Sequence, residues 1–316
     1  MINKRRAFIV GIKSTTLSKK EKIFLKKHKP WGVILFSRNL KDFKQIVRLT
    51  SEIKSIFSDK KYPILIDQEG GRVNRLNKLI DTSILTAKYF GNLYKLNKKK
   101  FFSYYKVYIA QTSYLLNELG ININTVPVLD VGRFTNNSII GDRSYSSIPK
   151  NVSKIGDYCI KEFNNEKIGT VIKHIPGHGL TKIDSHKKTP VIKNKIKYLF
   201  KKDFSTFKNK NSFFAMTAHI IYKDIDPKYT ATHSSKIIKL IRNNIGFKNI
   251  IISDDISMKS LKYSVKSNTQ RALSAGCNLI LHCNGKYSEM KIVAENSPKL
   301  DNFIIKKTSQ FYNFLS

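Results

Sequence analysis

The chain of 316 residues has little cysteine, no long apolar run and few acidic residues. Its three cysteines, Cys159, Cys277 and Cys283, are too few and of odd number for a disulfide framework, which indicates a reducing compartment. No stretch reaches the ~18 consecutive apolar residues of a transmembrane helix. The six apolar residues at 7–12 are also too short for the core of a signal peptide. These absences predict a cytoplasmic protein without membrane insertion.

Acidic residues are scarce beside basic ones: 22 Asp and Glu against 58 Lys and Arg give a formal net charge of +36. Such a charge favours binding to polyanions, including nucleic acid, when the basic residues form one patch. The lysines are instead spread along the whole chain among Asn and Ile. We therefore interpret the charge as a composition bias and expect no specific nucleic-acid partner. An inactive, polyanion-binding protein stays open as an alternative.

What the chain does contain is a series of eight short apolar runs of the kind that form buried strands. They lie at 7–10, 32–36, 63–66, 121–129, 170–172, 213–216, 249–252 and 279–281. Stretches with helical spacing lie between several of them, at 43–57, 101–119 and 152–163, and Gly120 stands where a helix C-cap is expected. Eight alternating units predict an α/β fold: a (β/α)8 TIM barrel that residues 1–316 form as a single domain. A doubly wound open sheet is the alternative.

Polar side chains follow most of these runs. They are Arg38, Asp67, Asp130, His174, His219, Asp254 and Asn284. Because barrel sites are built at the C-terminal ends of the strands, we expect one ring of loops to gather all of them.

Asp254 is the first catalytic candidate. It follows the run at 249–252, so it would stand on a rigid strand at the mouth of the barrel, where a nucleophile can be held against an anomeric carbon. An Asp in this place could instead cap the following helix, and the next residue, Asp255, suits that role better. We predict that Asp254 is catalytic.

The loop after the fifth run, 173–186, is the second candidate region. Its glycines permit an irregular path, and Asp184 lies two residues before His186. A carboxylate there can fix the imidazole tautomer and raise its pKa, which leaves the other nitrogen for proton transfer. An exposed loop without a role is the alternative. His174 and His178 could join this pair as metal ligands, but the spacing matches no zinc signature, so we predict no metal and no cofactor. His178 is expected to brace the loop.

Residues 67–75 and 141–144 supply further polar candidates. A carboxylate at Asp67 can accept hydrogen bonds from two hydroxyls, and Arg75 can donate in a fork to oxygen acceptors. Arg143 lies on a long loop, and its local sequence leaves a functional and a non-functional role equally open.

Taken together, these motifs make the whole chain resemble the single-domain β-N-acetylglucosaminidases of glycoside hydrolase family 3. The matching stretches are 35–39, 67–73, 127–131, 141–144, 173–179 with 184–186, and 253–258, in the family's order. The resemblance implies a retaining exo-hydrolase in which Asp254 forms a covalent glycosyl-enzyme. It also implies that His186, oriented by Asp184, is the acid/base.

By the same resemblance, Asp67, Arg75, Arg143, Lys173 and His174 would bind the hydroxyls and acetamido group of a terminal N-acetylglucosamine. The family's usual task in bacteria is to remove this sugar from 1,6-anhydro-N-acetylmuramyl products, with or without peptide, in cell-wall recycling. The expected partner is therefore a small glycan, and the expected state is a monomer.

The acid/base and two local sequences depart from common patterns. Most retaining glycosidases use two carboxyl groups, and relatives with a carboxylic acid/base often take it from a second domain, which we do not expect here. A histidine acid/base repels an incoming anion less than a carboxylate would. A phosphorylase, which would use the same site with phosphate as acceptor, is therefore a second hypothesis. Asn278 replaces a common acidic residue, and 230–232 reads Thr-Ala-Thr in place of Pro-Ala-Ser/Thr. We expect both changes to affect local packing alone.

Overall fold

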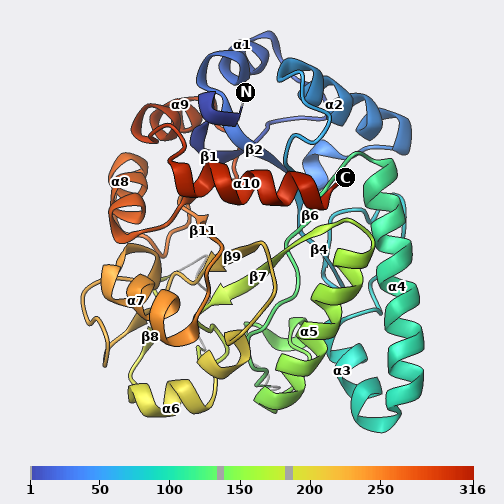
Figure 1. Cartoon of the computed structure of the whole chain (residues 1–316), viewed down its shortest axis with the longest axis vertical. Helices are drawn as coiled ribbons and strands as arrows, with labels where there is room; N and C mark the ends of the chain where they lie inside the picture. Colours follow the sequence, from blue (N-terminus) through green and yellow to red (C-terminus); the bar gives the residue numbers. More distant parts are fainter. Residues whose placement is uncertain (1, 134–138, 182–187) are drawn as a thin grey trace.

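The structure is a computed structural model that describes residues 2–133, 139–181 and 188–316 (Figure 1). In this part of the chain, eight parallel strands close into a barrel in the order β1-β12-β11-β9-β7-β6-β3-β2. They are β1 (Arg6–Gly11), β2 (Pro30–Leu35), β3 (Ile64–Ile66), β6 (Ile123–Asn124), β7 (Gly169–Ile175), β9 (Phe214–Thr217), β11 (Ile250–Asp255) and β12 (Leu279–His282). The predicted barrel is confirmed, and the open sheet is wrong.

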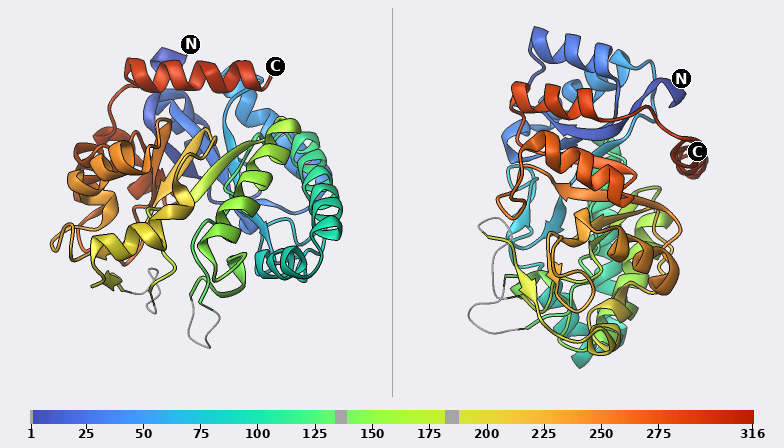
Figure 2. Two further views of the ribbon diagram at one scale, coloured as in Figure 1. Left: turned by 60° about the horizontal axis from the view of Figure 1, so that its bottom comes forward. Right: turned by 90° about the vertical axis from the view of Figure 1, so that its left-hand side faces the viewer.

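Helices surround the barrel (Figures 1 and 2). They are α1 (Lys19–His28), α2 (Phe43–Ile56), α3 (Ala87–Leu96), α4 (Lys98–Glu118), α5 (Pro149–Asn165), α6 (Ile196–Lys201), α7 (Ser235–Leu240), α8 (Val265–Ala275), α9 (Tyr287–Asn296) and α10 (Asn302–Phe314). The three predicted helices are present as α2, α4 and α5, and Gly120 follows α4 with a φ of 72°. None of the described helices is long and apolar enough to cross a membrane.

Short elements decorate the loops. Two small sheets are formed by β4 (Gln68–Gly70) with β5 (Val73–Asn74), and by β8 (Val191–Ile192) with β10 (Ile221–Tyr222). The 3-10 helices are η1 (Ile2–Lys4), η2 (Ser37–Asn39), η3 (Gly141–Arg143), η4 (Phe204–Phe207) and η5 (Ala231–His233), and a π-helical turn, η6 (Ile241–Ile245), continues α7.

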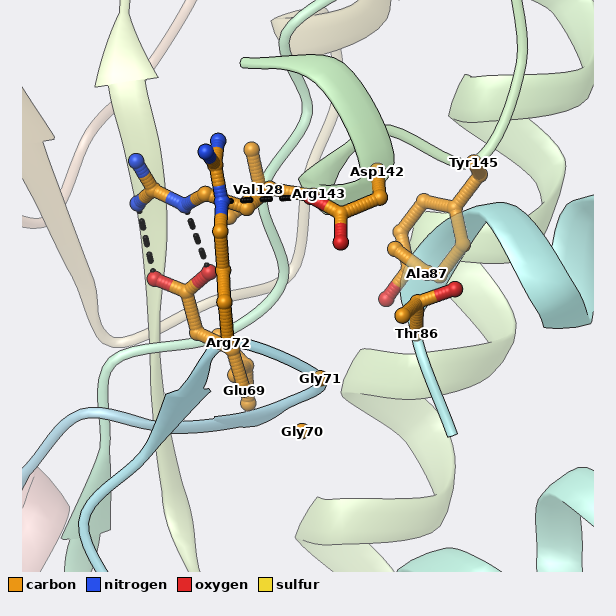
Figure 3. A pocket seen from close by; sticks show the side chains of 11 residues that line it. Glu69, Gly70, Gly71, Arg72, Thr86, Ala87, Val128, Asp142, Arg143 and Tyr145 are labelled. Atoms are coloured by element: carbon orange, nitrogen blue, oxygen red, sulfur yellow. Dashed lines mark hydrogen bonds and ion pairs between the residues drawn. The ribbon is translucent and has the colours of Figure 1, made fainter. Parts of the chain in front are cut away.

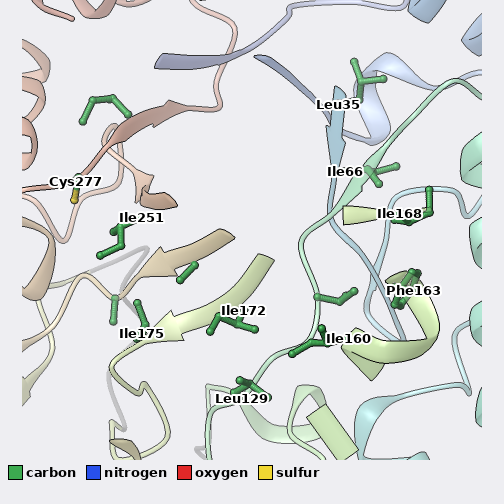
Figure 4. Close-up of a cluster of buried hydrophobic side chains, with 14 of the residues drawn as sticks. Leu35, Ile66, Leu129, Ile160, Phe163, Ile168, Ile172, Ile175, Ile251 and Cys277 are labelled. Carbon is green, nitrogen blue, oxygen red and sulfur yellow. The ribbon is translucent and has the colours of Figure 1, made fainter. Parts of the chain in front are cut away.

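Side chains along the barrel strands alternate between two apolar layers, as the two-residue period of a strand requires. On β11, Ile250 and Ile252 belong to the barrel interior, whereas Ile251 packs in the layer between strands and helices. Figure 4 shows part of that outer layer, where Ile172 of β7 lies near Ile160 of α5. The same alternation puts residue 254 with the interior set, at the C-terminal end of its strand.

Helix α10 closes the N-terminal end of the barrel (Figure 2). The ring of Phe311 packs edge-on against Phe214, with centroids 5.2 Å apart. A Cβ at Gly169 would lie 2.6 Å from the Phe311 ring, so the glycine permits this approach. The indole of Trp31 donates a hydrogen bond of 2.9 Å to Thr308 Oγ1 on α10. Because these apolar contacts fill the N-terminal end of the barrel, a site is expected at the opposite end.

The strand predicted at 121–129 is much shorter than expected. Only β6 pairs as a strand, followed by an isolated bridge between Val128 and Lys173. Side-chain amides replace the backbone ladder: Asn122 Oδ1 accepts from Ile64 N–H at 2.9 Å. Pro127 also lacks the N–H that would continue the pairing. The apolar run therefore pairs as a strand over two residues and contacts β7 again at 127–129.

Candidate active site

A cavity of about 270 Å³ opens at the C-terminal ends of the barrel strands. The interior side chains Met216 and Leu281 form part of its apolar wall. All six predicted site residues that the structure describes line it: Asp67, Arg75, Arg143, Lys173, His174 and Asp254. The barrel thus brings together side chains that are almost 190 residues apart in sequence, because its strand ends meet on one face.

Lys173 on β7 joins two carboxylates on one side of this cavity. Its Nζ lies 3.2 Å from Asp67 Oδ1 and 2.6 Å from Glu69 Oε1. Arg75 Nη2 lies 3.2 Å from Asp67 Oδ2, and the hydroxyl of Thr125 donates to Asp67 and accepts from Lys173. Burial alone would raise the pKa of Asp67, but Lys173 and Arg75 hold it well below its usual value. Asp67 is therefore an ionised acceptor at neutral pH.

Glu69 lies in the matching stretch 67–73, but the sequence predicts no role for it. Figure 3 shows its carboxylate facing Arg143, which donates from Nε and Nη2 in a fork with both distances 2.8 Å. Despite burial, which acts to raise it, Arg143 and Lys173 hold the pKa of Glu69 at about 2. The small cavity in Figure 3 measures about 10 Å³ and has room for only a single water. The sequence signal for Glu69 was its two-residue spacing from Asp67.

His174 is held by a second buried carboxylate. Its Nδ1 lies 2.7 Å from Asp130 Oδ2, and Asp130 also accepts backbone N–H groups from His174 and His178. Burial acts to raise the pKa of Asp130, but the interaction with His174 lowers it overall. An ionised Asp130 fixes the tautomer with Nδ1–H as donor, which leaves Nε2 of His174 for other contacts. Asp130 was predicted to lie on this face, but not as the partner of His174.

Asp254 is the last residue but one of β11 and lines the cavity, as predicted. Its Oδ1 accepts a hydrogen bond of 2.7 Å from the backbone N–H of Asp255. Behind it, Nε2–H of the buried His219 donates to the carbonyl of Asp255 at 3.0 Å. Burial lowers the pKa of His219, although Asp254 acts to raise it. A neutral imidazole thus supports the strand end that carries the predicted nucleophile.

The expected helix cap at Asp255 is wrong. Its carboxylate accepts from the backbone N–H of Ser257 at 3.1 Å and of Cys283 at 3.2 Å, so it closes a turn and ties two loops together. Helix α8 begins ten residues later, at Val265, where the hydroxyl of Ser264 is the N-cap.

The predicted acid/base pair, Asp184 and His186, lies outside the described residues. The segment before it packs tightly: Gly177 has a φ of 145°, and a Cβ at that position would lie 2.5 Å from Cβ of Asp203. His178 bonds Asp130 through its backbone and Thr181 through Nδ1 at 3.2 Å. His178 therefore braces this part of the loop, as expected.

Four of the seven polar residues expected on the common ring do not line the cavity: Arg38, Asp130, His219 and Asn284. Asp130 and His219 contact residues of the cavity wall or strand end from behind. Arg38 donates from Nε to the carbonyl of Ile12 at 2.9 Å, and Asn284 donates to Glu289 Oε2 at 2.6 Å, so these two side chains hold loops together. The expectation that all seven would line one site is wrong for these four.

The described residues contain no group of three or more His, Cys, Asp or Glu that could hold a metal ion. Within the same ranges, two of the carboxylates that line the cavity, those of Asp67 and Glu69, are paired with Lys173, Arg75 and Arg143. The donor set present is therefore that of an ion-paired hydrogen-bonding site.

Comparison with known proteins places this geometry in a family. Residues 7–306 match the glycosyl hydrolase family 3 N-terminal domain. The chain is 33% identical over 287 residues to a protein named Beta-hexosaminidase from Haemophilus ducreyi, covering 87% of this chain and 80% of the relative. A Beta-hexosaminidase from Psychromonas ingrahamii is 29% identical over 316 residues, with 97% and 89% covered.

Solved structures agree. NagZ from Neisseria gonorrhoeae, in complex with N-trifluoroacetyl-D-glucosamine, superposes with a TM-score of 0.83 at 26% identity, covering 99% of this chain and 90% of that chain. A family 3 β-N-acetylglucosaminidase from Paenibacillus sp. gives a TM-score of 0.86 at 25% identity, and the present chain covers 61% of that longer chain. The resemblance drawn from the motifs is confirmed. The chain belongs to glycosyl hydrolase family 3.

Proposed function

We propose that this chain is a retaining exo-β-N-acetylglucosaminidase, a β-N-acetylhexosaminidase that uses no metal or other cofactor. The observation that carries the proposal is the position of Asp254, at the mouth of the barrel in one cavity with the ion-paired Asp67, Lys173 and Arg75. Family membership supports it, as do relatives named Beta-hexosaminidase and a similar structure whose ligand is N-trifluoroacetyl-D-glucosamine.

In this proposal, the paired groups of the cavity bind the terminal sugar. The ionised Asp67 accepts hydrogen bonds from sugar hydroxyls, while Lys173, Arg75 and Nε2 of His174 contact its oxygens. Arg143 is oriented by its fork on Glu69, which leaves Nη1 for an oxygen of the substrate. Because these groups are already paired and buried, little reorganisation is needed when the sugar binds.

The reaction then proceeds in two displacements. Asp254 attacks C1, the bond from C1 to the leaving oxygen breaks, and the imidazolium of His186 gives that oxygen a proton. In the second step, neutral His186 takes a proton from water, the water oxygen attacks C1, and the ester to Asp254 breaks. Asp184 orients His186. The roles of Asp184 and His186 rest on the motif that they share with the family.

We further propose that the substrate is N-acetylglucosaminyl-1,6-anhydro-N-acetylmuramic acid, with or without peptide, and that a cytoplasmic monomer cleaves it during cell-wall recycling. Exo action is what the family resemblance implies, and Met216 and Leu281 form the wall of the cavity towards the barrel interior.

The test is to follow hydrolysis of an aryl 2-acetamido-2-deoxy-β-D-glucopyranoside by NMR, with and without phosphate. We expect the β anomer of N-acetylglucosamine as first product and no activity in Asp254→Ala. The control variant is Asp224→Ala, which removes a carboxylate paired with Lys195 at the surface. A first product of α configuration, or undiminished turnover in Asp254→Ala, contradicts the proposal. Accumulation of the sugar 1-phosphate would favour a phosphorylase.

A further inference from the structure

A separate cavity of about 50 Å³ lies between the loops that follow β9 and β11. None of the described residues lines both this cavity and the catalytic one. Three buried side-chain atoms on its wall have no hydrogen-bond partner among the described residues: Thr230 Oγ1, His233 Nε2 and Ser260 Oγ. Each of these residues is more than nine-tenths buried. Because buried polar groups are almost always paired, three unpaired atoms around one cavity indicate a missing ligand.

The walls of this cavity favour an oxygen ligand with negative charge. Lys228 and Lys262 line it, and neither forms an ion pair with a described residue. No Asp or Glu is among its described lining residues. The carboxylate of nearby Asp226 is already used, since it accepts from Ser234 Oγ at 2.6 Å and from the backbone N–H of Lys228 at 3.1 Å.

The size of the cavity limits the ligand. By the same measure that leaves room for a single water in the cavity of Figure 3, about 50 Å³ accommodates a few waters or a single carboxylate group. A carboxylate has two oxygens and several lone pairs, which match two hydroxyls and one ring N–H.

We propose that this cavity binds a carboxylate group, with the hydroxyls of Thr230 and Ser260 as donors, Nε2 of His233 as a third donor when the ring is an imidazolium, and Lys228 and Lys262 at its rim. Two sources supply this chemistry: a free small organic acid, or the lactyl or peptide carboxylate of a substrate. The second source rests on the proposed function, whereas the first does not.

Binding should change the protonation of His233. Burial above all, and to a smaller extent His219 and Arg271, lower its pKa to about 4, while a hydrogen bond with the backbone of Asn268 acts to raise it. An anion against Nε2 favours the imidazolium, so the pKa of His233 should rise when the cavity is filled. Lys228 and Lys262 act in the opposite direction and are present with and without the ligand.

The test is to titrate the full-length protein with sodium acetate and follow the histidine ring signals by NMR. We expect the His233 signal to shift saturably, with a Kd on the order of 1 mM for so small a ligand, and its pKa to rise by about one unit. Acetamide and sodium chloride at equal concentrations should leave it unchanged. His28 serves as internal control: burial, followed by Lys27 and Arg6, lowers its pKa, and the two cations would also gather anions unspecifically.

Variants and a second ligand sharpen the test. Thr230→Val and Ser260→Ala should each weaken acetate binding about tenfold, since each removes one buried donor. N-acetylmuramic acid, which carries a lactyl carboxylate, should bind more tightly than acetate if the carboxylate comes from a substrate, and no more tightly if it comes from a free acid. A His233 signal that does not shift with acetate, or that shifts equally with acetate and acetamide, overturns the proposal and indicates that the cavity holds water. This result is obtained on the wild-type protein, so it does not depend on whether the variants fold.

Discussion

Replacing Lys173 by Met should destabilise the protein by about 3–5 kcal/mol at pH 7, the usual cost of leaving a buried charge without its partner. The Lys173 side chain is 3% exposed and is shared by Asp67 and Glu69, at 3.2 and 2.6 Å. Methionine keeps most of the apolar stem but brings no charge. Because the two carboxylates would retain Arg75 and Arg143 as separate partners, the loss should lie at the lower end of this range.

The loss should depend on pH in a defined direction. Asp67 and Glu69 have pKa values below those of an unfolded chain, at about 2 for Glu69, so their ion pairs stabilise the fold above pH ~4 and lose this contribution as pH falls through the folded values. Without Lys173, burial raises both pKa values. The difference between wild type and variant should therefore be largest at pH 7 and shrink as pH falls from about 5 to 3.

Urea unfolding, followed by the fluorescence of the buried Trp31, measures this difference. Lys210→Met is a matched control, because the Lys210 side chain is 2% exposed but its partner Asp157 is 53% exposed. Asp157 becomes solvated when the lysine is lost, so we expect a loss of about 1 kcal/mol or less. Equal losses in the two variants, or a loss in Lys173→Met that does not change with pH, would refute the reasoning.

Three further substitutions test other parts of the fold. Burial raises the pKa of Asp203 to about 7, so the stability of the wild type should fall as pH rises from 4 to 7. The variant Asp203→Asn has no proton to lose, so its stability should gain about 2–4 kcal/mol over that of the wild type between pH 4 and 8. A gain that is constant with pH would contradict this. Asn278→Asp should raise stability by about 1 kcal/mol, because Arg242 donates to Asn278 Oδ1 at 2.7 Å and would gain a charged acceptor; an unchanged melting temperature argues against it. Thr308→Val should cost about 1–3 kcal/mol in urea unfolding by leaving the buried Nε1–H of Trp31 unpaired, whereas a loss below ~0.5 kcal/mol would show that this bond is unimportant.

The positions of the strands could be predicted from the sequence because burial on both faces leaves an uninterrupted apolar run. The run at 249–252 became β11, and the residue that follows two positions later reached the cavity. Within the run at 121–129 only β6 forms a strand, because the pairing there is decided by the side chain of Asn122 and by Pro127 rather than by hydrophobicity. The spacing of apolar residues does not indicate which backbone groups will form hydrogen bonds with a side-chain amide.

Six of the predicted site residues line one cavity, but the pairing between their side chains could not be predicted. Asp67, Lys173 and Asp254 follow or end strands, so their common face follows from the barrel. The contacts of Glu69 with Lys173 and of Asp130 with His174 join residues far apart in sequence, and no local pattern reports such distances. Sequence likewise gave no sign of the cavity at Thr230, His233 and Ser260, because its walls come from two separate loops.

The most direct test of the central claim is to trap the glycosyl-enzyme. The protein is incubated with an activated fluorosugar of N-acetylglucosamine, digested, and analysed by mass spectrometry. The proposed mechanism predicts one covalent adduct per chain, on Asp254, which is lost in Asp254→Ala. An adduct on another residue, or turnover of the aryl glycoside with no trapped species and with full activity in Asp254→Ala, would contradict it.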